Sequence, residues 1–213
     1  MSAIIDRAPG RRATRISSEG AILVAAETVF AEKGYDGATM SAIAAAASLP
    51  KANVHYYFAT KEQLYRRVIA GILEAWLDAA RAFDEFGSAA EALRRYIGAK
   101  MDLARERPYG SRVFAKEIMR GAPVAQDFLD TTLKEWLEER ARVVRRWIGE
   151  GQLRPIEPRT LFFMIWATTQ HYADFAHQIA ALNGGAPLSD AAFQAAKDEV
   201  IAVILGGVGQ AKA

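Results

Sequence analysis

The sequence predicts an all-α fold, and three observations support this prediction. Apolar residues recur along most of the chain at the three- and four-residue spacing of a helix face. No run of alternating β-branched residues predicts a strand, and the breakers Gly and Pro fall between the periodic segments. Hydrophobic residues make up 51% of the 213 residues and charged residues 24%, which suits a packed core and argues against disorder. We therefore expect one compact helical domain or two small ones.

Composition also limits the classes of function. The chain has no cysteine, which excludes disulfides, thiolate catalysis and cysteine-ligated metals and is typical of a reducing cytoplasm. No apolar run reaches the roughly 18–20 residues of a membrane span, and the start lacks the apolar segment of a secretory signal. The net charge is only +2, so any surface for nucleic acid has to be local. We expect a cytoplasmic protein with no membrane partner.

The chain begins with a polar segment and a first helix. Residues 1–15 carry four arginines, and we expect them to form a flexible basic arm. A helix is predicted over 16–33, because four apolar residues share one of its faces. They are Ile22, Ala26, Val29 and Phe30. Gly34 suits the C′ position that ends this helix.

Two short helices follow and form a helix-turn-helix pattern. Thr39 is a predicted N-cap for a helix that runs to residue 46. Pro50 suits the entry of a second helix over 51–57, because its fixed φ and missing N–H are tolerated there. Together with the preceding helix they predict a three-helix domain over residues 16–60.

The second short helix places lysines, a histidine and aromatic rings together, which neither a buried core nor a plain solvated surface favours. In a helix-turn-helix protein this helix enters the major groove, and polar and aromatic side chains contact base edges and phosphates. Its predicted contacts, with the first residue of the next helix, are Lys51, Asn53, His55, Tyr56, Tyr57 and Lys61. The other interpretation is that the rings fill a junction between two helical layers, since tight helix pairs are common. Nine basic and six acidic residues in 1–67 do not decide between the two.

The remaining residues, 61–213, predict a second helical domain. Thr60 caps its first helix, which we expect to continue to about residue 83. The further predicted helices cover 88–108, 109–120, 123–150, 157–182 and 189–205. The helix over 157–182 is apolar nearly all round, so both of its sides should be covered. We expect the last two helices to form a four-helix interface with a second copy of the chain.

Polar residues interrupt two inner faces of this domain. Glu117 lies beside Phe114, either as a carboxylate at the rim or paired with an arginine, or as an acceptor for a ligand N–H. In the helix over 157–182, the residues at steps of four are Phe162, Trp166, Gln170 and Asp174. Trp166 can cover a planar ring, and the Gln170 amide offers a donor and an acceptor, which predicts a small-ligand site. The alternative is a buried polar network that fixes helix register.

Catalysis is not expected. His171 and His177 are six residues apart and lie on different helix faces, which disfavours a shared metal ion. His171 and Asp174 are spaced as an acid–base pair, but no nucleophile lies near them in sequence. No glycine-rich phosphate loop occurs. We expect no metal, no cofactor and no enzymatic activity.

The stretch AAETVFAEKGYDGATMSAIAAAASLPKANVHYYFATKEQLY resembles the N-terminal DNA-binding domain of TetR-family transcriptional regulators. The resemblance implies a homodimeric repressor that binds a palindromic operator in double-stranded DNA and has a divergent ligand-binding domain. The implied operator contacts are Thr39, Lys51, His55, Tyr56, Tyr57 and Lys61. The sequence departs from the family at Ser48, where a glycine is usual, and at Pro50, where a serine is usual. Ser48 should cost stability if its φ is positive.

Two C-terminal stretches, SRVFAKEIMRGAP and FFMIWATTQHYADFAHQI, resemble the pyrimidine-utilisation regulators of the Rut type. This resemblance implies a pyrimidine effector such as uracil or thymine. Two alternatives stay open: a regulator of the same family that answers to an unrelated small molecule, and an architectural DNA-binding protein without an effector.

Overall fold

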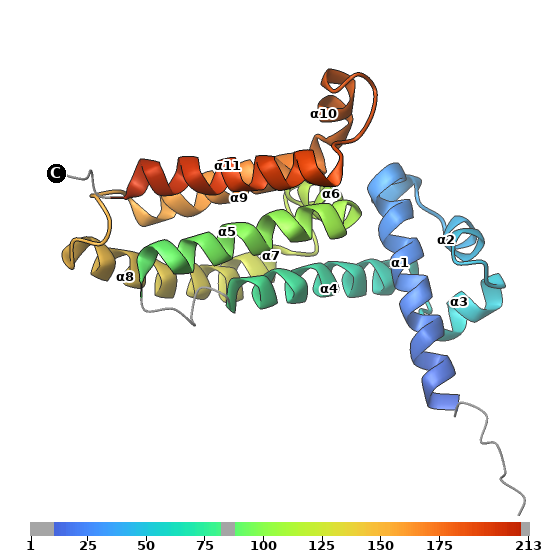
Figure 1. The fold of residues 1–213 in the computed structure, drawn as a ribbon. Coiled ribbons are helices and arrows are strands. Elements are labelled where there is room, and N and C mark those ends of the chain that lie inside the picture. Colours follow the sequence, from blue (N-terminus) through green and yellow to red (C-terminus); the bar gives the residue numbers. More distant parts are fainter. Residues whose placement is uncertain (1–10, 82–87, 210–213) are drawn as a thin grey trace, which may run out of the picture. The chain divides into compact units, whose positions relative to one another are not determined.

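A computed structural model describes residues 11–81 and 88–209 (Figure 1). The chain divides into two compact units, residues 1–70 and residues 71–213, and each is described by itself. Every named element is helical, and the described ranges contain no strand beyond an isolated bridge between Leu153 and Gly209. The predicted all-α fold class is therefore confirmed.

The first unit contains α1 (Arg11–Gly37), α2 (Met40–Ala46), α3 (Lys51–Tyr57) and the beginning of α4 (Lys61–Arg81). Because α1 begins at Arg11, residues 11–15 of the predicted flexible arm are helical, and residues 1–10 lie outside the described part of the chain. The physical reason is local: the breakers Pro9 and Gly10 come before this segment, and the arginines and alanine in it are good helix formers.

The core face predicted for the first helix is confirmed, since Ile22, Ala26, Val29 and Phe30 are all buried. Gly34 interrupts α1 with a φ of 70°, as expected for a left-handed residue after a helix, and the chain resumes a helical turn to Gly37.

The turn between α2 and α3 is held by backbone hydrogen bonds. Thr39 caps the start of α2, because its Oγ1 accepts from the Ala42 N–H at 3.1 Å. At the end of α2, the Ser48 N–H donates to Ala45 O at 3.1 Å and the Leu49 N–H donates to Ala44 O at 3.0 Å. This pair of bonds is a Schellman motif, and its C′ residue, Ser48, has a φ of 54°. A serine therefore occupies a left-handed position that favours glycine.

The second unit is a helical bundle. After α4 it contains α5 (Ala89–Glu106), α6 (Pro108–Met119), α7 (Gln126–Phe128), the π-turn η1 (Leu129–Leu133), α8 (Lys134–Gly149), α9 (Pro158–Asp174), α10 (Ala176–Leu182) and α11 (Asp190–Val208). Helix α5 packs against α6, α9 and α11, and α9 also packs against α6 and α8. α10 projects beyond the packed ends of α9 and α11 (Figure 1). The core between these helices includes Leu93, Ile97, Trp147, Phe162 and Ile165.

Two predicted helices are shorter than expected. The helix over 123–150 begins at Gln126 and contains the π-turn η1 before α8. The helix over 157–182 is broken at Phe175, between α9 and α10. No Gly or Pro marks either interruption, so tertiary packing overrides a continuous helical pattern at both places.

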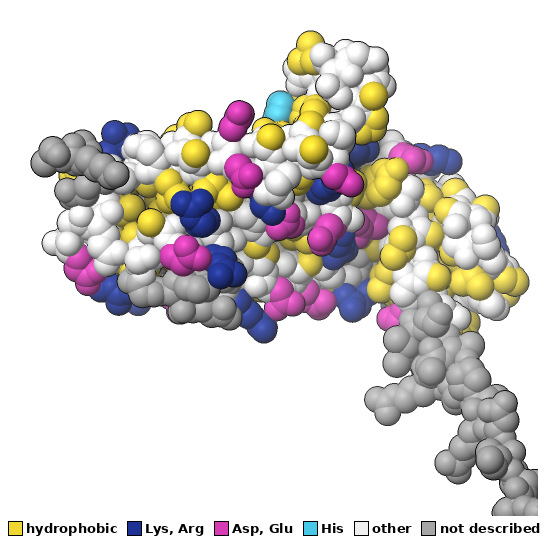
Figure 2. Space-filling view, viewed as in Figure 1, with side chains coloured by type: hydrophobic (Ala, Val, Ile, Leu, Met, Phe, Trp, Pro, Cys, Tyr) yellow, Lys and Arg dark blue, Asp and Glu magenta, His cyan; other side chains and the backbone are white. Residues whose placement is uncertain are grey.

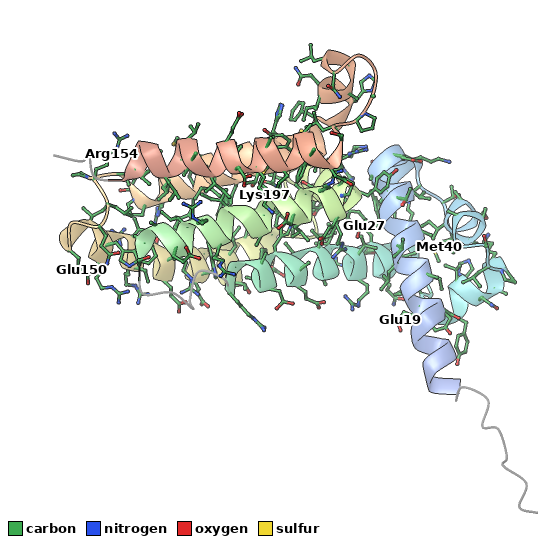
Figure 3. All side chains as sticks on the ribbon, in the orientation of Figure 1. Glu19, Glu27, Met40, Glu150, Arg154 and Lys197 are labelled. Carbon is green, nitrogen blue, oxygen red and sulfur yellow. The ribbon has the colours of Figure 1, made fainter. Side chains whose placement is uncertain are left out.

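The surface of this unit is mixed in charge. Figure 2 shows acidic and basic side chains interspersed over the face that carries α5 and α11. Lys197 of α11 points toward α5 (Figure 3), and its Nζ lies 2.6 Å from Asp102 Oδ1. Arg105 of α5 pairs with Asp190 at the start of α11. Throughout residues 11–81 and 88–209, no helix combines the length and hydropathy needed to cross a membrane.

Candidate functional site

In the first unit, α3 presents its polar side to solvent. Val54 is fully buried and Phe58, directly after the helix, is nearly so, and these two residues hold α3 against the rest of the unit. The predicted contacts lie on the other side of the helix. Lys51, Asn53 and His55 are exposed, Tyr56 is 74% exposed and Tyr57 is half-buried. The Tyr56 and Tyr57 rings meet edge to face at 5.2 Å. Neither ring is buried, so neither fills a junction between helical layers.

Lys61 has a structural role that the sequence did not indicate. Its Nζ donates to Tyr35 O at 2.8 Å and to Ala38 O at 3.1 Å, and it lies 4.5 Å from the centre of the Tyr35 ring. The ammonium group has three donors, so one remains for a phosphate. Lys61 thus fixes the end of α1 and the chain that follows it.

Thr39 also combines two roles. Its Oγ1 accepts the Ala42 N–H, as an N-cap does, while the side chain stays exposed. The hydroxyl hydrogen is not used by this bond and can be donated. Thr39 and Lys61 are the two predicted contacts outside α3. Each forms a hydrogen bond within the protein and retains a donor hydrogen for DNA.

The second unit holds a cavity of about 250 Å³. Its walls come from α4, α5, α6, the α7–η1 segment, α8 and α9. The lining residues are Trp76, Leu77, Ala80, Tyr96, Lys100, Phe114, Ile118, Phe128, Leu129, Leu133, Trp136, Trp166 and Gln170. Of the six predicted ligand residues, Phe114, Trp166 and Gln170 line it, and Phe162, Glu117 and Asp174 do not.

Phe162 and Glu117 support the cavity from behind. Phe162 is fully buried, and its ring lies 5.3 Å from that of Trp136, which is a lining residue. Glu117 is fully buried instead of lying at the rim, and its Oε1 accepts the N–H groups of Val124 at 2.6 Å and Ala125 at 3.0 Å. Glu117 therefore anchors the turn that leads into α7. The sequence could not show this role, because only the folded turn brings these two N–H groups to the carboxylate.

Asp174 lies at the end of α9 with its Oδ1 buried, and this atom has no hydrogen-bond partner among the described residues. The buried hydroxyl of Ser111 is near enough to Asp174 to lower its pKa, but it too forms no bond of ordinary hydrogen-bond geometry with the described residues. Burial raises the pKa of Asp174, and its neighbours Ser111, Arg112, Lys100 and His171 oppose that increase. Asp174 thus belongs to a polar cluster near the cavity and not to its lining.

Aromatic rings form most of the cavity wall and are fixed in place. The Trp166 Nε1–H donates to Tyr96 Oη at 2.7 Å. Burial raises the pKa of Tyr96, so its hydroxyl stays neutral at physiological pH. Trp76 meets Phe114 edge to face at 4.4 Å, and Trp136 lies 6.3 Å from Trp166. A flat apolar ligand would therefore meet preformed ring surfaces.

Lys100 and Gln170 are the lining residues that carry an amine and an amide. Lys100 is only 5% exposed, and its Nζ lies 4.1 Å from the centre of the Trp76 ring. Burial lowers the pKa of Lys100 to about 8, and Asp174 opposes this decrease. Lys100 was not predicted. It follows Tyr96 by four residues, so both side chains lie on one face of α5.

Comparisons with known proteins agree with this architecture. Residues 22–68 match the family described as bacterial regulatory proteins, tetR family, and residues 69–211 match the C-terminal region of YcdC-like proteins. The HTH-type transcriptional regulator RutR of Escherichia coli strain K12 is 38% identical over 200 residues, which cover 93% of this chain and 94% of RutR. The HTH-type transcriptional repressor KstR2 of Mycolicibacterium smegmatis is 24% identical over 213 residues, covering 96% of this chain and 97% of KstR2.

Solved structures show the same fold. The ketosteroid transcriptional regulator KstR2 of Mycobacterium tuberculosis superimposes with a TM-score of 0.75 at 21% identity, covering 91% of this chain and 95% of that one. Apo AibR superimposes with a TM-score of 0.68 at 18% identity, covering 87% and 97%. From both family matches and the identity to RutR, the chain belongs to the tetR family of bacterial transcriptional regulators.

Proposed function

We propose that the protein is a ligand-responsive repressor whose dimer binds a palindromic operator and releases it when a pyrimidine, such as uracil or thymine, enters the second unit. The observation that carries this proposal is the cavity walled by tryptophan and phenylalanine rings, with one amine and one amide on its surface. A regulator without an effector has no need of a preformed aromatic cavity, since cavities cost stability.

The size of the cavity favours a small ring. At about 250 Å³ it lies just below the range of roughly 300–1,000 Å³ typical of sites for drug-sized ligands. A single flat heterocycle suits this volume better than a fused ring system of the steroid class. The Gln170 amide offers a donor and an acceptor side by side, which matches the adjacent C=O and N–H groups of a pyrimidine edge.

On the DNA side, α3 supplies the proposed contacts. Lys51 and Asn53 lie in its first turn and are exposed, and His55, Tyr56 and Tyr57 follow in its second turn. Amines and hydroxyls of this kind bind phosphate oxygens and base edges, and the amines make affinity depend on salt. Two copies of α3 in a dimer would meet two half-sites, which is the reason to propose a palindromic operator.

The proposed dimer interface lies on α9 and α11. Phe163 and Met164 of α9 are 54% and 52% exposed, and Val203 of α11 is 74% exposed. Large apolar side chains gathered on neighbouring helices favour a second copy as their cover, because two identical helix pairs form a four-helix bundle.

Helix α4 is the proposed route of coupling. It begins at Lys61, which fixes the end of α1, and it later carries Trp76, Leu77 and Ala80 to the cavity wall. In this proposal α4 has one position that favours operator binding and another that does not. A ligand in contact with Trp76 can change operator binding only if its affinity differs between these two positions.

The test uses an operator obtained by in vitro selection from random DNA, because that step requires no knowledge of the regulated genes. Uracil and thymine should raise the melting temperature and weaken operator binding, measured by fluorescence anisotropy at fixed salt. At about 100 times the dissociation constant the stabilisation is roughly 2.7 kcal/mol. Trp166→Ala with Gln170→Ala should abolish both responses and leave operator affinity unchanged.

Three results would contradict the proposal in different ways. If other metabolites raise the melting temperature and pyrimidines do not, the protein is a regulator of the same family with an unrelated effector. No shift with any compound would support an architectural DNA-binding protein. Turnover of uracil by the purified chain would show an enzymatic activity that we do not expect.

A further inference from the structure

Lys100 of α5 is a buried cation without a hydrogen-bond acceptor. The side chain is 5% exposed, yet within residues 11–81 and 88–209 its ammonium forms neither a hydrogen bond nor an ion pair. Its Nζ lies 4.1 Å from the centre of the Trp76 ring, and the Asp174 carboxyl acts on it electrostatically without a hydrogen bond. Because Lys100 lines the cavity and is otherwise covered by protein, the surface it retains faces the ligand site.

This arrangement is costly for the protein alone. An ammonium group taken out of water without an acceptor loses its hydration, and a ring face replaces only part of that loss. Burial lowers the pKa of Lys100 to about 8, which is the sign of this cost, but the group still carries its proton at neutral pH. Methionine has nearly the same length and would fill the position without any such cost. The lysine is therefore not explained by packing.

We propose that Lys100 determines ligand specificity by donating to an oxygen acceptor of the effector, either a carbonyl oxygen or an oxyanion. This inference rests on the proposed function, because it takes the cavity as an effector site. Lys100 and Gln170 then divide the recognition between them. Lys100 can only donate, whereas the Gln170 amide can do both, so the two side chains select a ring with an acceptor at one position and a donor–acceptor edge at another.

Ligand analogues that lack one oxygen should bind more weakly. A site built to hydrogen-bond a polar group rejects a ligand that lacks it, because the buried partner is then left unpaired. For uracil, removal of the oxygen that faces Lys100 should lower affinity by roughly 10- to 100-fold, the usual range for a hydrogen bond to a charged group. Pyrimidin-2-one and pyrimidin-4-one each lack one of the two oxygens, so one of them should bind far more weakly than the other.

The experiment combines binding and stability. Lys100→Met is compared with Lys134→Met, which removes a lysine from an exposed position of α8. Calorimetric titration with uracil and both pyrimidinones is done on the wild type and the two variants. Thermal unfolding of each is measured without ligand. We expect Lys100→Met to raise the melting temperature, to weaken uracil binding by at least 10-fold, and to bind uracil and the weaker pyrimidinone equally. Lys134→Met should change none of these quantities.

A fall in melting temperature for Lys100→Met, or unchanged uracil affinity, would overturn the inference, because Lys100 would then be a packing residue. If the wild type binds none of the three pyrimidines, the pyrimidine proposal fails. The change in melting temperature from the wild type to Lys100→Met then decides alone whether Lys100 is an unsatisfied cation. If Lys100→Met does not fold, equal binding of uracil and both pyrimidinones to the wild type would be the overturning result.

Discussion

Replacing Ser48 by glycine should stabilise the first unit. Ser48 is the C′ residue of the Schellman motif after α2 and has a φ of 54°, a region where a side chain costs about 1–2 kcal/mol. Glycine removes that cost but loses more backbone entropy on folding, roughly 0.5–1 kcal/mol. The exposed serine side chain makes no hydrogen bond to the described residues. The net gain is therefore about 0.5–1 kcal/mol, which raises the unfolding midpoint of a unit of this size by roughly 2–8 °C.

The assay is urea and thermal unfolding followed by circular dichroism, with Ser41→Gly as the matched control. Ser41 is also an exposed serine, but it lies inside α2, where glycine lowers stability by about 0.5 kcal/mol. The same chemical change should thus have opposite signs seven residues apart. If Ser48→Gly is neutral or destabilising while Ser41→Gly behaves as expected, the turn does not hold a left-handed residue in solution.

Three further predictions concern charged and polar groups. Glu117→Leu should lower the free energy of unfolding by about 2–4 kcal/mol in urea titrations, because two backbone N–H groups lose their acceptor. Tyr56→Ala should weaken operator binding in anisotropy titrations without changing the melting temperature, whereas Lys61→Ala should lower both, since it also frees two carbonyl groups. The folded pKa of Lys100, about 8, lies below its ordinary 10.5, so the folded state binds fewer protons between these values and stability should rise with pH there. The free energy of unfolding in urea should be about 2 kcal/mol higher at pH 9.5 than at pH 7, and Lys100→Met should lack this gain. The upper pH is kept at 9.5 because the raised pKa of Tyr96 lowers stability at higher pH.

Local chemistry explains why most helices could be predicted from the sequence. Gly34 has the positive φ, Thr39 forms the cap and α3 follows Pro50 directly, each for a reason carried by the residue and its neighbours. The breaks at η1 and Phe175 have no such local signal. The Phe175 ring stacks on that of His171 at 4.9 Å, but residues four apart also meet on a continuous helix, so this contact does not explain the break.

Most of the ligand-site residues that the sequence predicted lie on one face of α9. The four-residue spacing placed Trp166 and Gln170 correctly on the inner face of α9, and both line the cavity. Phe162 and Asp174 share that face, but one lies in the core behind the cavity and the other in a polar cluster beyond it. Periodicity predicts which face of a helix a side chain is on. Which residues of that face reach the cavity depends on other helices, among them α4, α5 and α8.

Three charged residues, two of them buried and one partly buried, have roles that the sequence alone does not separate. Glu117 and Lys100 interrupt apolar helix faces, and Lys61 begins α4. In the fold, Glu117 receives two backbone N–H groups and Lys61 donates to two carbonyl groups, so both charges hold neighbouring chain segments. Lys100 has a ring face and no acceptor among the residues described. A buried charge that the backbone satisfies has a sufficient structural reason, whereas a buried charge that faces a cavity without an acceptor is a candidate for contact with a ligand. The proposed determinant of effector choice therefore lies on α5, a helix in which the sequence analysis named no ligand residue.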